Sequence, residues 1–137
     1  MEFDAAAVEA EVRAAFDGYE AALGANDVAA LTGYFWQSPR AVRLMTEGGL
    51  YGIEAIAAFR KGRDFSDVAR ELTRVDTVAL TSDIAVATAE YRRTGSGRRG
   101  AQSQVWIRRP EGWRIASAHV SLAAAGDWRQ IIAELVG

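Results

Sequence analysis

The chain has 137 residues, half of them apolar and a quarter charged, a composition that suits one globular domain with a single core. Its formal net charge of −2 predicts no general affinity for nucleic acid or for an anionic membrane. Cysteine is absent, which excludes disulfides, thiolate metal sites and cysteine nucleophiles. The acidic N-terminus lacks the apolar region of a secretory signal, and no apolar run approaches the ~20 residues that cross a bilayer. We therefore expect a single cytoplasmic domain over residues 1–137.

The first 35 residues carry two helical patterns. Asp4 can cap a helix that runs to about Gly24, and its apolar residues recur at spacings of three and four. Glycine at position 24 offers a C-cap for that helix. Asn26 or Asp27 then caps a short second helix over residues 28–35.

The rest of the chain is mostly strand. Residues Glu47-Gly48-Gly49 are predicted to end the first strand. In chain order we expect a strand over 41–46, a helix over 53–63, strands over 71–80 and 84–94, two strands within 101–121, and a last helix over 127–136. The apolar residues of that last helix would pack on another surface: Ile131, Ile132, Leu135 and Val136. This order predicts an α+β fold, in which helices from the N-terminal half pack on one face of a strongly curved, mostly antiparallel sheet.

The last two strands form a hairpin whose register decides which side chains share a face. The sequence RPEGW at 109–113 predicts a three-residue loop, because proline suits a type I turn and glycine the left-handed residue after it. That loop pairs Ser103 with His119. Gln104 and Trp106 then lie on the opposite face, unless a bulge intervenes.

Two sequence features resemble functional motifs but have ordinary structural interpretations. Residues 95–100 match G-x-G-x-x-G, but they join two strands and no helix follows, so we interpret them as a hairpin loop and not as a dinucleotide site. His119 is the only histidine, which excludes a histidine-cluster metal site. A structural hydrogen bond is the ordinary role of such a residue.

Four polar residues remain candidates for a site, each with an alternative. Arg43 lies in an apolar strand: on the inner face it would need an anion or a carboxylate, and on the outer face it would be solvated. Tyr19, on the apolar face of the first helix, could be a core aromatic. Arg60 and Arg63 could be snorkelling side chains or the second half of an anion clamp.

The order of elements, with the ending GWRIASAHVS, resembles the cone-shaped α+β barrel of the SnoaL-like, nuclear-transport-factor-like superfamily. More narrowly, the chain resembles the small HpxZ/AtzH-like family across roughly residues 16–122. The motifs that carry this likeness are Phe-Trp, Pro-Arg-x-Val-Arg, Tyr-Gly, an Ala-Phe-Arg helix, a Gln-Ser-Gln strand and a terminal His-Val-Ser.

The resemblance implies a role in the breakdown of ureides and cyanuric acid. One branch of the family is described as a decarboxylating amidohydrolase acting on dicarboxyurea, and the other is linked to oxalurate. An essential tyrosine and an essential arginine of the family match Tyr19 and Arg43, and the superfamily commonly pairs through the outer face of its sheet.

We therefore predict a small, cofactor-free, metal-free homodimeric enzyme that hydrolyses or decarboxylates a carboxylated, urea-like anion. The expected catalytic residues are Tyr19 and Arg43, and the expected substrate contacts are Arg60, Gln104, Trp106 and His119. Tyr19 could donate a proton to the leaving nitrogen or position water. The alternatives are a non-catalytic binding or assembly protein of a ureide pathway, and another SnoaL-like isomerase or cyclase, which would need an acid–base carboxylate inside the cone.

Overall fold

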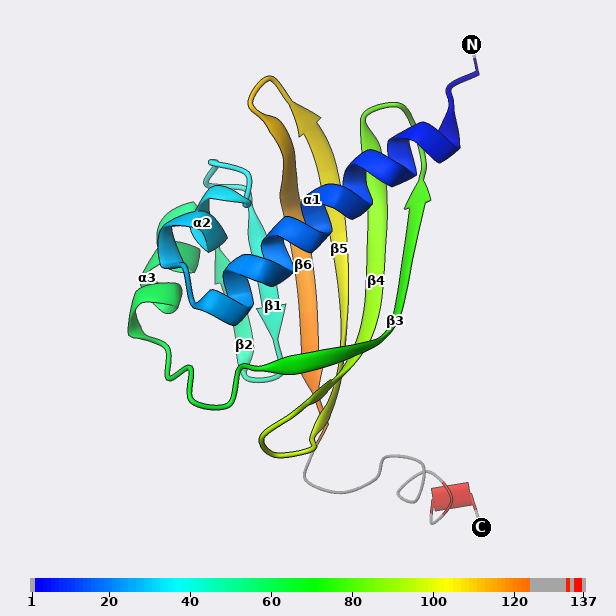
Figure 1. Cartoon of the computed structure of the whole chain (residues 1–137). Coiled ribbons are helices and arrows are strands. Elements are labelled where there is room, and N and C mark those ends of the chain that lie inside the picture. Colours follow the sequence, from blue (N-terminus) through cyan, green and yellow to red (C-terminus); the bar gives the residue numbers. More distant parts are fainter. Residues whose placement is uncertain (1, 124–132, 134, 137) are drawn as a thin grey trace.

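The computed structural model describes residues 2–123, 133, 135 and 136, and it shows three helices covering one face of a curved six-stranded sheet (Figure 1). The helices are α1 (Ala5–Ala25), α2 (Val28–Gly33) and α3 (Ile53–Gly62). The strands are β1 (Val42–Met45), β2 (Gly48–Tyr51), β3 (Arg70–Ala79), β4 (Ile84–Arg93), β5 (Arg99–Arg109) and β6 (Gly112–Leu122). The α+β fold class predicted from the sequence is confirmed.

Helix α1 begins as predicted and ends differently. The Asp4 carboxylate accepts a hydrogen bond from the Ala7 N–H at 3.1 Å, which caps the first turn. Gly24 stays helical, and the C-cap is Asn26, which takes the left-handed conformation at φ 50°. Asparagine tolerates that conformation. Asp27 is therefore left to cap α2, through the N–H of Ala30 at 3.1 Å.

The sheet has the order β2-β1-β6-β5-β4-β3, with β1 and β6 parallel and all other neighbours antiparallel. Strands β2 and β3 are edges, so the cone is open. Strand β2 was missed by the sequence analysis, because Glu47-Gly48-Gly49 looked like a break. The turn consists of Thr46 and Glu47, and Gly48 and Gly49 already belong to β2, since Met45 pairs with Gly48 and the chain runs straight back along β1.

The β5–β6 hairpin combines a wrong prediction with a right one. Arg109 pairs with Gly112, so the loop has two residues and not three. A bulge on β6 then shifts the register between Val105 and Trp106 by one residue. Because the two offsets cancel, Ser103 pairs with His119 as predicted.

The hairpin's register separates two faces. Gln102, Gln104 and Trp106 point toward the helices and are buried, whereas Ser103 and His119 lie on the outer face and are exposed. The inner face of the sheet and the apolar face of α1 share one core. Its members from α1 include Val12, Phe16 and Tyr19, and those from the sheet include Ala87, Trp106 and Ile115.

The outer face carries a row of mostly apolar side chains that crosses all six strands. The row consists of Val78, Val86, Val105, Ser117, Val42 and Tyr51, each paired with the next. Val78 is 50% exposed and Tyr51 is 70% exposed. The homodimer expected from the sequence stays a prediction, and this row is the surface on which it would form.

The predicted helix over residues 127–136 falls mostly outside the described residues. Leu135 and Val136 are described, and at 80% and 82% exposed they are not packed against the described part of this chain, so the packing expected for them stays a prediction. Within the described residues, no helix is long and apolar enough to span a membrane.

Candidate functional site

A cavity of about 440 Å³ lies between the C-terminal end of α1, helix α3 and the inner face of the sheet. Its lining contains several arginines from different elements: Arg43, Arg60, Arg63, Arg70, Arg93 and Arg98. Glu47 and Asp64 also line it, and both are exposed. The cavity is therefore strongly cationic in a chain whose net charge is slightly negative.

Tyr19 reaches this cavity from the last turns of α1. Its ring packs edge-on against Tyr34, with centroids 6.0 Å apart, and against Phe35, with centroids 6.2 Å apart. Close approach of Tyr34 requires Gly18, where an added Cβ would lie 2.1 Å from the Tyr34 Oη. The Tyr19 Oη accepts a hydrogen bond from Arg60 Nη2. Because a guanidinium can only donate, the Tyr19 hydroxyl keeps its own proton free for a ligand.

Arg43 extends inward from β1 and is 8% exposed, so its side chain takes the inner of the two faces that the sequence left open. Its guanidinium carbon lies 4.9 Å from the centroid of the Phe59 ring, and its Nη1 has no hydrogen-bond partner in the described part of the chain. Burial, with the Arg60 charge adding to it, lowers the pKa of Arg43 to about 10.

Arg60 and Arg63 bring two further cations from α3 and its C-cap. Arg60 is 2% exposed, and its Nε and Nη1 have no partner among the described residues. The same holds for Nε and Nη2 of Arg63. Burial, followed by the charge of Arg60, lowers the pKa of Arg63 to about 10. Neither arginine forms an ion pair within the described ranges, and Arg43 forms none there either.

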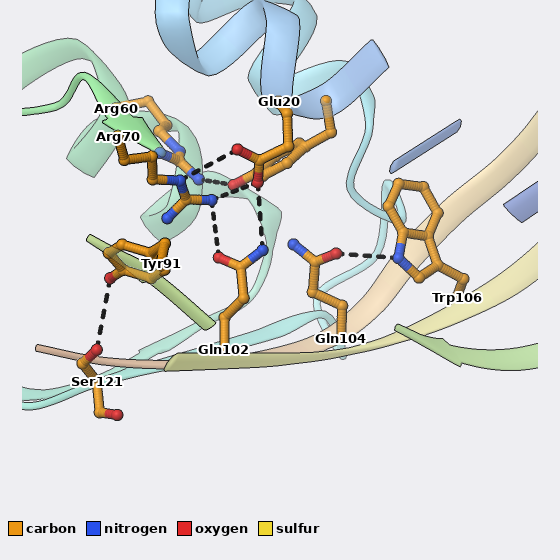
Figure 2. Close-up of polar contacts among 9 residues, drawn as sticks. Glu20, Arg60, Arg70, Tyr91, Gln102, Gln104, Trp106 and Ser121 are labelled. Atoms are coloured by element: carbon orange, nitrogen blue, oxygen red, sulfur yellow. Dashed lines mark hydrogen bonds and ion pairs between the residues drawn. The ribbon is translucent and has the colours of Figure 1, made fainter. Parts of the chain in front are cut away.

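Arg70, on the same cavity wall, has the opposite arrangement (Figure 2). Its Nε donates to Glu20 Oε2 at 3.1 Å, its Nη2 donates to Glu20 Oε1, and Nη2 also donates to Gln102 Oε1 at 2.9 Å. Gln102 Nε2 closes the network by donating to Glu20 Oε1 at 3.3 Å. The Arg70 guanidinium stacks on the Tyr91 ring, 4.2 Å from its centroid.

Comparison with known proteins identifies the family of this arginine-lined cone. A family model described as AtzH-like matches residues 1–126. The chain belongs to the AtzH-like family. A search of curated proteins found no match.

Several solved structures are similar to this chain. A protein of unknown function from Pectobacterium atrosepticum is 47% identical with a TM-score of 0.82, and the match covers 87% of this chain and 93% of that one. A cystatin-like fold protein from Burkholderia xenovorans is 36% identical with a TM-score of 0.80, covering 87% and 94%. An NTF2-like superfamily protein from Salmonella enterica is 24% identical with a TM-score of 0.71, covering 88% and 95%, and it supports the fold alone.

Three predicted residues of the AtzH-like site meet in the cavity and three do not. Tyr19, Arg43 and Arg60 line it together. Gln104 and Trp106 lie on the same sheet face but deeper, where Trp106 Nε1 donates to Gln104 Oε1 at 3.0 Å, and neither lines the cavity. His119 is not brought to the site, because its position in β6 after the bulge turns it to the exposed outer face.

The Arg70 network was not predicted from the sequence. Gln102 could have been found, because it lies two residues before Gln104 and therefore shares its face. Glu20 and Arg70 could not, since their pairing joins positions 50 residues apart without any local signal. No group of three metal-ligating side chains occurs among the residues that the structure describes.

Proposed function

We propose that this AtzH-like protein is a small amidohydrolase or decarboxylase that acts on a carboxylated, urea-like anion. The supporting observation is the group formed by Arg43, Arg60 and Arg63, which we call the open arginines. They line one cavity, Arg43 and Arg60 are buried and Arg63 is half-buried, and none of them forms an ion pair with a carboxylate of the described residues. Buried charges require a partner, and a ligand carboxylate would supply it.

The chemistry of the open arginines favours carboxylates over other small anions. A guanidinium is planar and presents parallel N–H donors that match the two oxygens of a carboxylate. The unpartnered nitrogens of Arg43 and Arg63 come from two different elements, so two separated anionic groups of one ligand can each meet a donor pair. A cavity of about 440 Å³ lies within the range of small-molecule sites.

Tyr19 is suited to the proton transfer that such a reaction needs. In decarboxylation of a carboxylated urea, the bond between nitrogen and the carboxylate carbon breaks, the carbon leaves as CO₂, and the electron pair stays on the nitrogen, which must then gain a proton. In hydrolysis, a water oxygen bonds to the carbon as the C–N bond breaks, the water proton passes to solvent, and the leaving nitrogen needs the same proton. The Tyr19 hydroxyl can give that proton, because it accepts from Arg60 and donates to no described residue. The Arg60 guanidinium would stabilise the negative charge left on the oxygen. Solvent then returns the proton to Tyr19.

The isomerase or cyclase alternative receives less support from the same cavity. It needs a carboxylate that can exchange a proton with an apolar ligand. Glu20 is engaged with Arg70. Asp64 is exposed and accepts from the Ser66 N–H at 2.9 Å, and these hydrogen bonds hold its pKa below the usual range, which weakens it as a base.

The test of the proposed function starts with ligand binding. Wild type and Arg43→Ala are melted with oxalurate, malonate and the uncharged ureide biuret. A ligand at one hundred times its dissociation constant stabilises a protein by about 2.7 kcal/mol, which raises the melting temperature by several degrees. We expect a shift with the two anions that is lost in Arg43→Ala. Arg74→Ala, which removes an exposed arginine paired with Asp76, is the matched control and should keep the shift.

Turnover then separates an enzyme from a binding protein. Carboxylated ureas are incubated with wild type and Tyr19→Phe, and released CO₂ and ammonia are measured. We expect Tyr19→Phe to lose ~100-fold or more of the activity, as for the loss of a general acid. Anion binding without turnover in wild type would favour the non-catalytic alternative. Absence of any anion-induced shift would reject the ureide proposal itself.

We also propose that a second copy of the chain covers the row of side chains from Val78 to Tyr51 on the outer face. The row is exposed at its two ends and half-buried between them, and a contiguous, mostly apolar surface of this kind favours an interaction site. One face can bury itself against its own copy around a two-fold axis. Light scattering after size exclusion should give twice the chain mass of 14.8 kDa. Val105→Asp, in the middle of the row, should give the monomer. A wild-type monomer at every concentration would reject this proposal.

A further inference from the structure

The ring of Phe59, on α3, lies beside two of the open arginines. The guanidinium carbon of Arg43 is 4.9 Å from the ring centroid, and that of Arg63 is 5.9 Å from it. Both distances are within the range of a cation–π contact. Arg43 comes from β1 and Arg63 follows α3, so one aromatic ring connects cations from two separate elements.

These two cations need something to hold them while the cavity is empty. Each is charged at neutral pH, since burial and the charge of Arg60 lower both pKa values only to about 10. Like charges in a partly dry cavity repel one another. In the described part of the chain neither arginine has a carboxylate partner that would oppose this repulsion.

An aromatic ring and a carboxylate hold a guanidinium in different ways. A carboxylate occupies the N–H donors at the edge, as Glu20 does with Nε and Nη2 of Arg70. A ring attracts the cation through its quadrupole and uses none of those donors. Accordingly, Arg43 Nη1 and both Nε and Nη2 of Arg63 remain without a described partner beside Phe59.

We propose that Phe59 is a positioning residue, which keeps Arg43 and Arg63 in place for a shared anionic ligand while leaving their hydrogen-bond donors free. The inference rests on the anion site of the proposed function and deepens it. Phe59 contributes affinity by preorganisation, because it removes motion that the ligand would otherwise have to suppress.

The experiment compares Phe59→Leu, which removes the ring but remains apolar, with Phe59→Tyr, which keeps a ring. Calorimetry measures the affinity of each variant for oxalurate and malonate, and circular dichroism confirms folding. We expect Phe59→Leu to bind about tenfold more weakly and Phe59→Tyr to bind within about threefold of wild type. Phe59→Met replaces Phe59→Leu if the latter does not fold.

A spectroscopic measurement on wild type tests the geometry without any substitution. In the unliganded protein, the Nε–H signals of Arg43 and Arg63 should be shifted by the ring current of Phe59, and Arg43→Lys and Arg63→Lys assign them. Ordinary, unshifted signals would overturn the inference, as would a folded Phe59→Leu that binds like wild type. If wild type binds no anion while both signals are shifted, the proposed function fails and the placement of the arginines by Phe59 stands.

Discussion

Two groups of arginines line the same cavity, and they differ in what neutralises them. Arg70 is held by Glu20 and Gln102 in a closed network, with 9% of its side chain exposed. Arg43 and Arg63 meet the face of an aromatic ring without a carboxylate, whereas Arg70 stacks on the Tyr91 ring and also pairs with the Glu20 carboxylate. Residue type and burial therefore do not distinguish a structural arginine from one that can bind a ligand. The two are distinguished by whether the N–H donors at the edge of the guanidinium are already used within the protein.

Helix α1 serves both groups with consecutive residues. Tyr19 accepts from Arg60 in the open group, and Glu20 pairs with Arg70 in the closed one. Successive helical residues point about 100° apart, so one helix can contact two neighbouring parts of a cavity wall. Stability and binding should therefore respond separately to changes at adjacent positions.

The largest effect should follow from opening the closed group. Glu20→Ala leaves the buried Arg70 without its charge partner, and we expect a loss of about 3–5 kcal/mol of unfolding free energy, measured with urea. Glu71→Ala breaks an exposed pair with Arg92 and should cost less than about 1 kcal/mol. A loss below about 1 kcal/mol in Glu20→Ala would remove the distinction between the two groups.

Removal of an open arginine should change the stability in the opposite direction and raise the unfolding free energy. Arg43→Met takes away a buried charge that repels Arg60 and replaces it with an apolar chain of similar length. We expect the unliganded protein to gain about 1–3 kcal/mol, because apolar substitution of buried ionic groups is often stabilising. Oxalurate should no longer shift its melting temperature. If Arg43→Met is as destabilised as Glu20→Ala, Arg43 is a structural residue after all.

Alkaline pH should reduce the difference in stability between Arg43→Met and wild type. Burial lowers the pKa of Arg43 from its higher, ordinary value in the unfolded chain to about 10 in the folded one. Between these values the unfolded chain binds more protons, so the contribution of Arg43 to stability rises with pH. The advantage of Arg43→Met over wild type, measured with urea at pH 8 and pH 10.5, should therefore shrink at the higher pH. An unchanged difference would contradict the lowered pKa.

The smallest effect on stability should come from the glycine next to Tyr19 on α1. Gly18→Ala places a methyl group against the Tyr34 hydroxyl. We expect a net loss of about 1 kcal/mol of unfolding free energy, because the cost of overpacking exceeds the gain from the higher helix propensity of alanine. Gly24 lies in the same helix with open space around it, so Gly24→Ala should gain up to about 1 kcal/mol. Thermal unfolding measures the stability of both variants. Equal effects at the two sites would show that Tyr34 yields readily.

Much of the fold could be predicted, because helical and strand periodicities are local. The strand predicted over 71–80 differs from β3 by one residue at each end, and the strand predicted over 84–94 differs from β4 by one residue at its C-terminal end. The face of Arg43 could not be decided, since alternation in a strand shows which residues share a face but not which face is inside. The Glu20–Arg70 pair was missed because its geometry arises only when α1 crosses the sheet.

The bulge on β6 has a consequence for how this site can change. Ala116 is the unpaired extra residue there, so the two halves of the strand have opposite alternation. Point substitutions leave that alternation untouched, whatever side chain they introduce. Loss of residue 116 would remove the bulge and leave a regular ladder, with Ile115 opposite Trp106 and Ser117 opposite Val105, so His119 would stay opposite Ser103 on the outer face. The bulge therefore holds one residue more than the ladder needs, and the length of β6 can change by one residue at this position without exchanging the side chains on its two faces.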